Sequence, residues 1–172
     1  MADTNEHPGA ALPDAPSQIL LTKEGYSALQ QELEHLTMVK RPEIAQRIRE
    51  SQEHGEFSED NSELDEVKFE QAIVETRIAE LKALFGTAQV LETKAIPTEH
   101  VGIGSLVKLN DKEFGDEFEV RIVTSVEANP SKNLVSNESP MGTVLMGKKI
   151  GDSVVVEAPD GKKTFKISGI RR

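Results

Sequence analysis

The sequence predicts an α+β protein, in which an N-terminal antiparallel coiled-coil hairpin is followed by an antiparallel β domain with one short helix. The first half has apolar residues at alternating steps of three and four, which is the spacing of paired helices. The second half has short apolar segments separated by turn residues, which is typical of strands. A chain of 172 residues can hold two such small units.

The net charge of −10 is concentrated in the hairpin half, since residues 1–100 contain 20 acidic and 9 basic residues. Such a surface disfavours general binding to duplex nucleic acid, which depends on Lys and Arg. A metal ion or a positively charged partner fits better. The chain has no cysteine, no apolar run of membrane length and no N-terminal signal pattern, so we expect a cytoplasmic protein.

Residues 1–17 contain three prolines and few large apolar side chains, so we expect a disordered tail. The hairpin is predicted for residues 18–93. Its first helix begins after Thr22, a suitable N-cap. The apolar stripe of this helix consists of Tyr26, Leu29, Leu33 and Leu36.

The stripe of the first helix slips by one residue in its second half. Apolar residues resume at Ile44 and Ile48, one position later than the heptad requires. Pro42 lies within the slip, and proline removes a backbone donor and crowds the preceding turn. We therefore expect a kink or a break at this proline.

The second helix carries an uninterrupted stripe. Its members are Leu64, Val67, Gln71, Val74, Ile78, Leu81, Phe85 and Ala88. At 1.5 Å per residue this stretch predicts a rod of roughly 37 Å. Gly86 and Pro97 mark the exit from the hairpin into a linker at residues 94–100.

An acidic bend joins the two helices, with its tip at residues 55–63. The stretch 50–66 holds eight acids and no Lys or Arg. Close carboxylates repel one another, so folding alone gives no reason to cluster them, whereas a hard cation such as Mg²⁺ removes the repulsion. A solvated helix end is the simpler alternative. A hairpin end cannot form a complete cage, so a metal site would need ligands from another molecule.

Four bases, Lys40, Arg41, Arg47 and Arg49, lie on the first helix close to the acidic bend. One interpretation is that they pair with neighbouring acids and keep the hairpin soluble. The other is that they contact the phosphates of a single-stranded nucleic acid. The sequence leaves both interpretations open.

The β domain is predicted for residues 101–172. The expected strands are 105–109, 118–126, 133–136, 153–158 and 164–170. Ser139 is suited to cap a short helix that begins at Pro140 and ends at Leu145 or Lys148. The domain shows no nucleophile with a paired base and no phosphate-binding glycine loop, so we expect a docking module.

Several segments are similar to those of the Gre family of bacterial transcript cleavage factors, and to its GreA branch more than to GreB. They are LTKEGY at 21–26, RPEI at 41–44, EHG at 53–55 followed by EFSEDNSEL, AQVLE at 88–92, and SPMG to LMGKKIGD at 139–152. They occur in the family's order and close to its spacing. The resemblance covers residues 19–172.

The resemblance implies a coiled coil that enters the secondary channel of RNA polymerase, and an FKBP-like C-terminal domain that docks at the channel rim. Tip carboxylates would help to hold the second catalytic Mg²⁺ jointly with the polymerase and to orient water, so that the 3′ end of a backtracked RNA is cleaved. Such a factor stimulates the polymerase and is not itself an enzyme. We expect it to act as a monomer.

By this resemblance the catalytic and metal-binding candidates are Glu56, Glu59 and Asp60. Glu56 stands where the family has Asp, and one extra residue lies between Gly55 and the second helix. Counted from the first helix, Glu59 takes the place of the family's second acid, whereas counted from the second helix, Asp60 does. Leu64 also replaces an aromatic residue of the family pattern.

The resemblance also implies that Glu138, Ser139 and Pro140 contact the polymerase rim, and that bases of the first helix, Arg41 above all, contact the extruded RNA. Because the tip departs from the family pattern, the alternative function is a channel-blocking inhibitor that does not promote cleavage. A proline isomerase or chaperone is a third hypothesis, weakened because the β domain has only three aromatic residues to line an apolar pocket.

Overall fold

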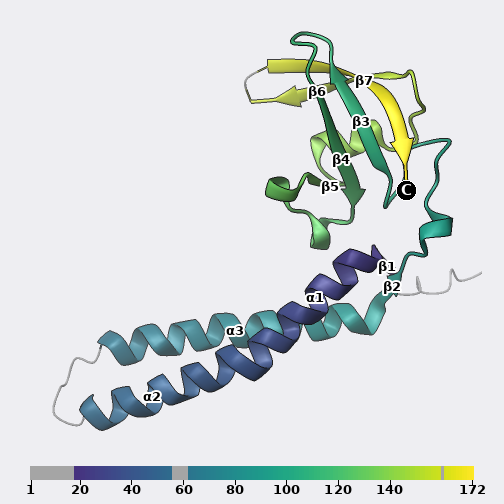
Figure 1. Cartoon of the computed structure of the whole chain (residues 1–172). Helices are drawn as coiled ribbons and strands as arrows, with labels where there is room; N and C mark the ends of the chain where they lie inside the picture. The colour runs from purple at the N-terminus through teal and green to yellow at the C-terminus, as the bar shows by residue number, and fades with distance from the viewer. Residues whose placement is uncertain (1–17, 56–61, 160) are drawn as a thin grey trace, which may run out of the picture.

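The computed structural model describes residues 18–55, 62–159 and 161–172. A long helical hairpin forms the N-terminal half, and a sheet domain stands over its open end (Figure 1). The predicted α+β fold is confirmed. The predicted tail, residues 1–17, lies outside the described residues. No helix of the described part is long and apolar enough to cross a membrane.

The first arm of the hairpin is a continuous helical rod. Its segments are α1 (Lys23–His35), the π-helical turn η1 (Leu36–Lys40) and α2 (Arg41–Gly55). Thr22 caps α1, as predicted, because its hydroxyl accepts a hydrogen bond of 3.0 Å from the N–H of Gly25. The rod therefore starts at the residue that the sequence indicates.

The π-helical turn η1 accommodates the one-residue slip in the apolar stripe. The N–H of Arg41 bonds to the carbonyl of Leu36, five residues back, so this turn contains one residue more than an α-helical turn. Pro42 follows directly and has no N–H to offer. The helix absorbs the extra residue instead of breaking, and Ile44 returns to the seam with 1% of its surface exposed.

The second arm is α3 (Ser62–Thr87), which packs along the first arm. Two apolar clusters fill the seam: Ile44, Val67, Val74 and Ile78 toward the tip, and Leu21, Leu29 and Leu81 toward the sheet domain. Near the sheet domain, the rings of Tyr26 and Phe85 meet edge to face, with centroids 5.0 Å apart. Gln71, the polar member of the predicted stripe, is exposed.

A two-stranded parallel ribbon closes the open end of the hairpin. β1 (Ile19–Leu21) pairs with β2 (Ala88–Val90), and Ile19 lies opposite Ala88. The N–H of Leu91 extends the ribbon with a bond of 2.7 Å to the carbonyl of Leu21. The sequence does not predict this ribbon, because strands of three residues show no measurable alternation.

The C-terminal domain contains a five-stranded sheet with the order β5-β4-β3-β7-β6. Its strands are β3 (Leu106–Asp111), β4 (Glu117–Val123), β5 (Leu134–Ser136), β6 (Ser153–Ala158) and β7 (Gly161–Arg171). Neighbouring strands are antiparallel except β4 and β5, which run parallel. The sheet is therefore mixed, whereas the sequence pattern predicts an antiparallel one.

One face of this sheet is covered by the predicted short helix, α4 (Pro140–Leu145). Leu145 is fully buried in a core with residues of β3, β4, β6 and β7. Three 3₁₀ turns complete the connections, namely η2 (Thr93–Ala95), η3 (Ser125–Glu127) and η4 (Pro130–Lys132). The turn η3 comes close to the start of α1, where the two halves of the chain meet.

Truncation of Ile44 tests the seam. Ile44→Ala should lower the free energy of unfolding by about 2–5 kcal/mol, because the lost side chain leaves a cavity between the arms. Urea denaturation followed by circular dichroism measures the change. The control is Ile73→Ala on α3, whose side chain is 54% exposed and should change stability by less than about 0.5 kcal/mol. Equal losses in the two variants would contradict the packing described.

Candidate functional site

The predicted metal ligands Glu56, Glu59 and Asp60 lie outside the described residues. The structure describes the helix ends that flank them, Gly55 of α2 and Ser62 of α3. Both ends lie at the extremity of the hairpin that is remote from the sheet domain (Figure 1). The two arms thus hold the flanks of the acidic stretch far from the C-terminal domain.

The described acids beside this connection are all exposed, namely Glu50, Glu53, Glu63, Asp65 and Glu66. Two of them lie in the first turn of α3, where the helix dipole favours negative charge. A shallow hollow of about 260 Å³ is lined by Arg47, Glu50, Ser51 and Glu63. Within the described residues, no group of three or more His, Asp or Glu side chains could hold a metal ion. The flanks therefore provide negative charge without a complete ligand set.

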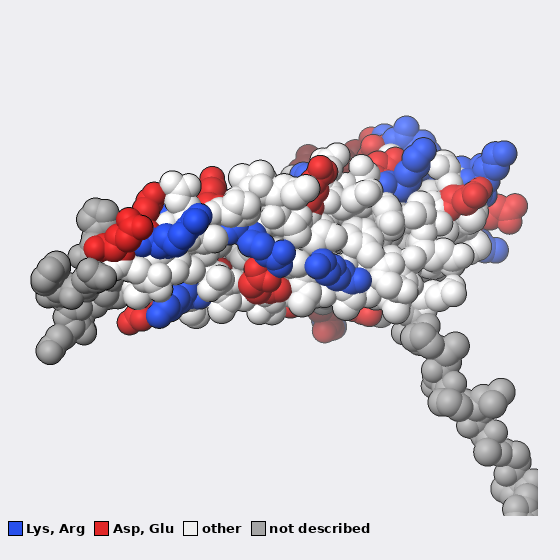
Figure 2. All heavy atoms as spheres, turned by 90° about the horizontal axis from the view of Figure 1, so that it is seen from below, with Lys and Arg blue, Asp and Glu red and all other residues white. Residues whose placement is uncertain are grey.

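Three of the four predicted RNA-contact bases form ion pairs with acids of the hairpin. The pairs are Lys40 with Glu43 at 3.2 Å, Arg41 with Glu75 at 2.6 Å and Arg47 with Glu70 at 2.5 Å. The fourth base, Arg49, is exposed. Figure 2 shows blue and red side chains interleaved along the hairpin, not an unbroken basic stripe. Local pairing of these bases is therefore present, and RNA contact stays a prediction.

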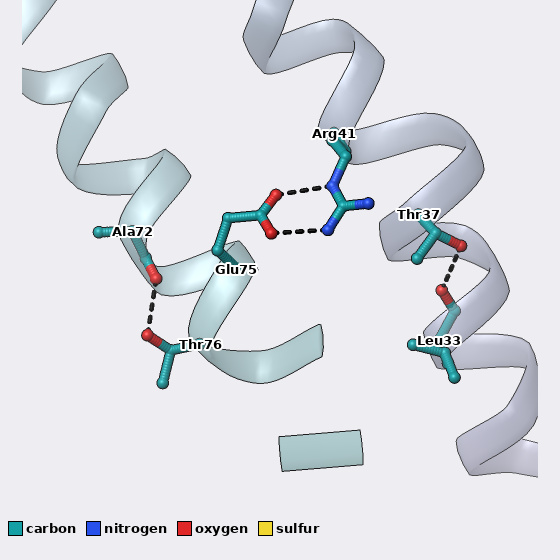
Figure 3. Close-up of polar contacts among 6 residues, drawn as sticks. All are labelled: Leu33, Thr37, Arg41, Ala72, Glu75 and Thr76. Atoms are coloured by element: carbon teal, nitrogen blue, oxygen red, sulfur yellow. Dashed lines mark hydrogen bonds and ion pairs between the residues drawn. The ribbon is translucent and has the colours of Figure 1, made fainter. Parts of the chain in front are cut away.

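The pair between Arg41 and Glu75 joins the two arms. The Nε and Nη2 atoms of Arg41 each donate a hydrogen bond of 2.6 Å to one carboxylate oxygen of Glu75, in a bidentate arrangement (Figure 3). Hydrogen bonding to Arg41 lowers the pKa of the Glu75 carboxyl, and the same bonds raise the pKa of Arg41. The other terminal nitrogen of Arg41 points away from Glu75 in Figure 3 and keeps its donors available.

The predicted docking residues form a rigid corner at the start of α4. The hydroxyl of Ser139 accepts from the N–H of Gly142 at 3.0 Å and donates to the carbonyl of Ser136 at 2.7 Å. Pro140 takes the first helical position, as predicted. Glu138 and Pro140 are exposed on this corner. A fixed backbone therefore presents one acid and one apolar ring to solvent.

A groove of about 770 Å³ adjoins this corner. Its lining comes from α4, β6 and β7 and consists of Glu138, Pro140, Thr143, Val144, Val155, Glu157 and Lys162. Val155 is 49% exposed and contributes apolar surface to this groove. Lys162 pairs with Glu157 at 3.1 Å across the groove wall. The structure thus joins two of the three predicted docking residues to an apolar surface with charged edges.

A buried carboxylate that the sequence did not indicate lies where the two halves of the chain meet. Glu127 of η3 accepts hydrogen bonds from the N–H of Thr22 at 2.8 Å and from its hydroxyl at 2.5 Å. Burial raises the pKa of Glu127, although both bonds from Thr22 act against the shift. In the sequence, the only available signal is an acid next to apolar Val126.

The chain matches two family models, one for each half. "Transcription elongation factor, N-terminal" matches residues 19–90, and "Transcription elongation factor, GreA/GreB, C-term" matches residues 96–172. Transcription elongation factor GreA of Acetivibrio thermocellus is 50% identical over 155 residues, which is 90% of this chain and 97% of the relative. GreA of Clostridium novyi is 45% identical over 154 residues, covering 90% and 96%.

Among solved structures, the GreA factor homolog 1 protein of Thermus thermophilus is 33% identical. The match covers 90% of this chain and 99% of that one, with a TM-score of 0.43.

The lowered pKa of Glu75 predicts a loss of hairpin stability in acid. Its pairing with Arg41 contributes fully above the unfolded pKa, near 4.5, and is lost as the pH falls through the lower folded pKa. The thermal midpoint of the wild type should therefore fall more between pH 5 and pH 3 than that of Glu75→Gln, followed by circular dichroism. Because the pair is half exposed, the difference should be small. Parallel curves would contradict this contribution.

Proposed function

Because this chain belongs to the GreA/GreB family of transcription elongation factors, we propose that it stimulates RNA polymerase to cleave backtracked RNA. Factors of this family stimulate the polymerase and do not catalyse cleavage alone. The observation that carries the proposal is the match of both halves of the chain to the family, supported by 50% identity to a GreA factor over 90% of the chain.

The hairpin is the part that would enter the secondary channel of the polymerase. From Lys23 to Gly55 the first arm is helical throughout, which at 1.5 Å per residue corresponds to roughly 50 Å. The paired arms bury the apolar residues of their seam against each other. The hairpin therefore needs no support from the sheet domain along its length and can occupy a channel.

The acidic tip would bring carboxylates to the polymerase active site. Carboxylate oxygens are ligands that Mg²⁺ accepts, and Mg²⁺ commonly takes only one or two from protein, so Glu56 with Glu59 or Asp60 suffices. The remaining ligands would come from the polymerase. When bound, the ion supplies charge stabilisation for the attack of water on the phosphate. A tip carboxylate would also orient that water.

The paired bases of the first arm can still contact RNA. Exposed ion pairs are weak because water screens them, so an RNA phosphate that approaches the hairpin can compete with Glu75 or Glu70. Arg41 can in addition use the nitrogen that points away from Glu75 (Figure 3). By its match to the family pattern Arg41 is the first candidate of the four bases, with Lys40, Arg47 and Arg49 as further candidates.

The corner at Glu138, Ser139 and Pro140 is the proposed docking point for the rim of the channel. Its backbone is fixed by the Ser139 hydrogen bonds, so docking requires little ordering of this segment. The adjoining groove, with Val144 and Val155, offers apolar area beside the charged corner. The combination of an apolar centre and a polar edge is typical of protein interfaces.

A channel-blocking inhibitor is the alternative function. The observation that favours it is the tip, which has one residue more than the family pattern and Glu56 in place of Asp. A tip that occupies the active site without the correct carboxylate geometry would obstruct nucleotide addition and leave RNA uncleaved.

A cleavage assay on a stalled, backtracked elongation complex distinguishes these functions. The wild-type protein should release short 3′ RNA fragments in the presence of Mg²⁺. Of Glu59→Ala and Asp60→Ala, the variant that removes the metal ligand should lower the maximal cleavage rate by at least about tenfold. Asp65→Ala, an exposed acid on α3, serves as the control and should leave the rate unchanged.

The same assay distinguishes a docking defect from a cleavage defect by means of a variant at the docking corner. Glu138→Lys should raise the protein concentration needed for half-maximal cleavage and leave the maximal rate unchanged. Absence of RNA release at every Mg²⁺ concentration would exclude the cleavage function. Slower nucleotide addition on complexes that are not backtracked would then support the inhibitor.

A further inference from the structure

The junction between the hairpin and the sheet domain depends on a bidentate contact between one buried acid and one N-cap. Glu127 is 7% exposed and Thr22 is 4% exposed, although they are 105 residues apart in sequence. The two carboxylate oxygens of Glu127 accept separately from the N–H and the hydroxyl of Thr22. Because the contact consists of two defined bonds, it fixes the orientation of Thr22 relative to Glu127 as well as the distance between them.

The Thr22 hydroxyl links this contact to the first turn of α1. It donates to Glu127 and at the same time accepts from the N–H of Gly25 at 3.0 Å. The approach is so close that a Cβ built on Gly25 would lie 1.7 Å from a carboxylate oxygen of Glu127. The carboxylate therefore rests on the positive end of the α1 dipole, and only glycine at position 25 leaves room for it.

Two further contacts between described residues join the halves near this point. The hydroxyl of Thr124 donates to the carbonyl of Leu20 at 3.2 Å, and Leu91, at the end of the hairpin segment, packs beside Gly104. Among the described residues, none of the three apolar core clusters contains members of both halves. An apolar core across the junction would resist rotation over a wide area. Since none of the described clusters spans it, the two directional bonds of Glu127 are the best-defined constraint on the angle.

Because the hairpin is long, a small change of angle at this junction causes a large displacement at its far end. A swing of 10° at the base of a rod of roughly 50 Å moves its end by about 9 Å. Catalysis tolerates far less, since a displacement of about 1 Å can reduce a rate by 10²-fold. The angle of α1 relative to the docking corner thus decides where the tip arrives.

We propose that Glu127 is a positioning residue for cleavage, because it fixes the direction of the hairpin relative to the docking domain. This inference rests on the proposed function. Glu127 touches neither RNA nor metal in this role. It acts through Thr22 and the first turn of α1, at the opposite end of the hairpin from Gly55 and Ser62, the helix ends that flank the tip acids in sequence.

Two variants weaken the contact in different ways. Glu127→Ala removes both acceptors. Gly25→Ala keeps the carboxylate but places a methyl group where it lies, and alanine otherwise favours a helix more than glycine does. The matched control is Gly86→Ala on α3, where a Cβ meets nothing within 4 Å. Glu127→Gln is the conservative variant, because it retains one acceptor and the side-chain length.

In the cleavage assay, the variants that weaken the contact should lower the maximal rate and leave binding to the polymerase nearly unchanged. Glu127→Ala and Gly25→Ala should lower the maximal cleavage rate at saturating protein by at least about tenfold, in keeping with a tip displaced by ångströms. The half-saturating concentration should change less than about twofold, because the docking corner is untouched. Glu127→Gln should recover most of the rate, and Gly86→Ala should equal the wild type.

A distance measurement tests the junction independently of cleavage. The chain has no cysteine, so spin labels can be placed on Ala45→Cys of α2 and Glu113→Cys of the sheet domain, both exposed positions. The wild type should give a narrow distance distribution and Gly25→Ala a broad or shifted one. A narrow, unshifted distribution in Glu127→Ala and Gly25→Ala would overturn the proposal. If the wild type itself does not promote cleavage, the proposed function fails while this measurement still reports on the junction.

Discussion

The burial of Ile44 and Val67 between the two arms is the interaction on which the rest of the structure depends. Both side chains are almost fully buried near the end of a hairpin that has solvent on its other faces. Most helical stability in proteins comes from the packing of an apolar face, and the pairing of the two arms along this seam provides that packing here. Without this seam, the end of the hairpin would have no defined position relative to the sheet domain.

The seam stays in register because of the π-helical turn η1. The extra residue rotates the second half of the arm so that Ile44 faces α3, and it also brings Arg41 opposite Glu75. A break at Pro42 would have divided the arm into two short helices. The single wide turn instead preserves a continuous rod from the N-cap to the acidic end.

Much of the fold was predictable because it is encoded in local patterns. The heptad stripe predicts the hairpin, Thr22 its start, and Ser139 with Pro140 the helix α4. The two parallel pairings, β1 with β2 and β4 with β5, were not predictable, since they join segments that carry no local signal of their partners. The contacts of Glu127 also depend on tertiary structure, because its partner is 105 residues away.

The candidate sites also divide into those that a local sequence pattern predicts and those that depend on tertiary contacts. The docking corner is a local motif, and the structure presents Glu138 and Pro140 on its surface. The predicted basic contacts were harder to interpret, because the acids that pair with Arg41 and Arg47 belong to the other arm. The tip acids Glu56, Glu59 and Asp60 lie outside the described residues, and their assignment depends on family membership.

The central claim is that the hairpin supplies carboxylates to a metal ion in the polymerase. It is tested most directly by the Mg²⁺ concentration at which a backtracked complex cleaves its RNA at half the maximal rate. The wild-type protein should lower this concentration by at least about tenfold, and a variant with alanine at both Glu59 and Asp60 should not. An unchanged Mg²⁺ dependence with the wild-type protein bound would contradict the claim.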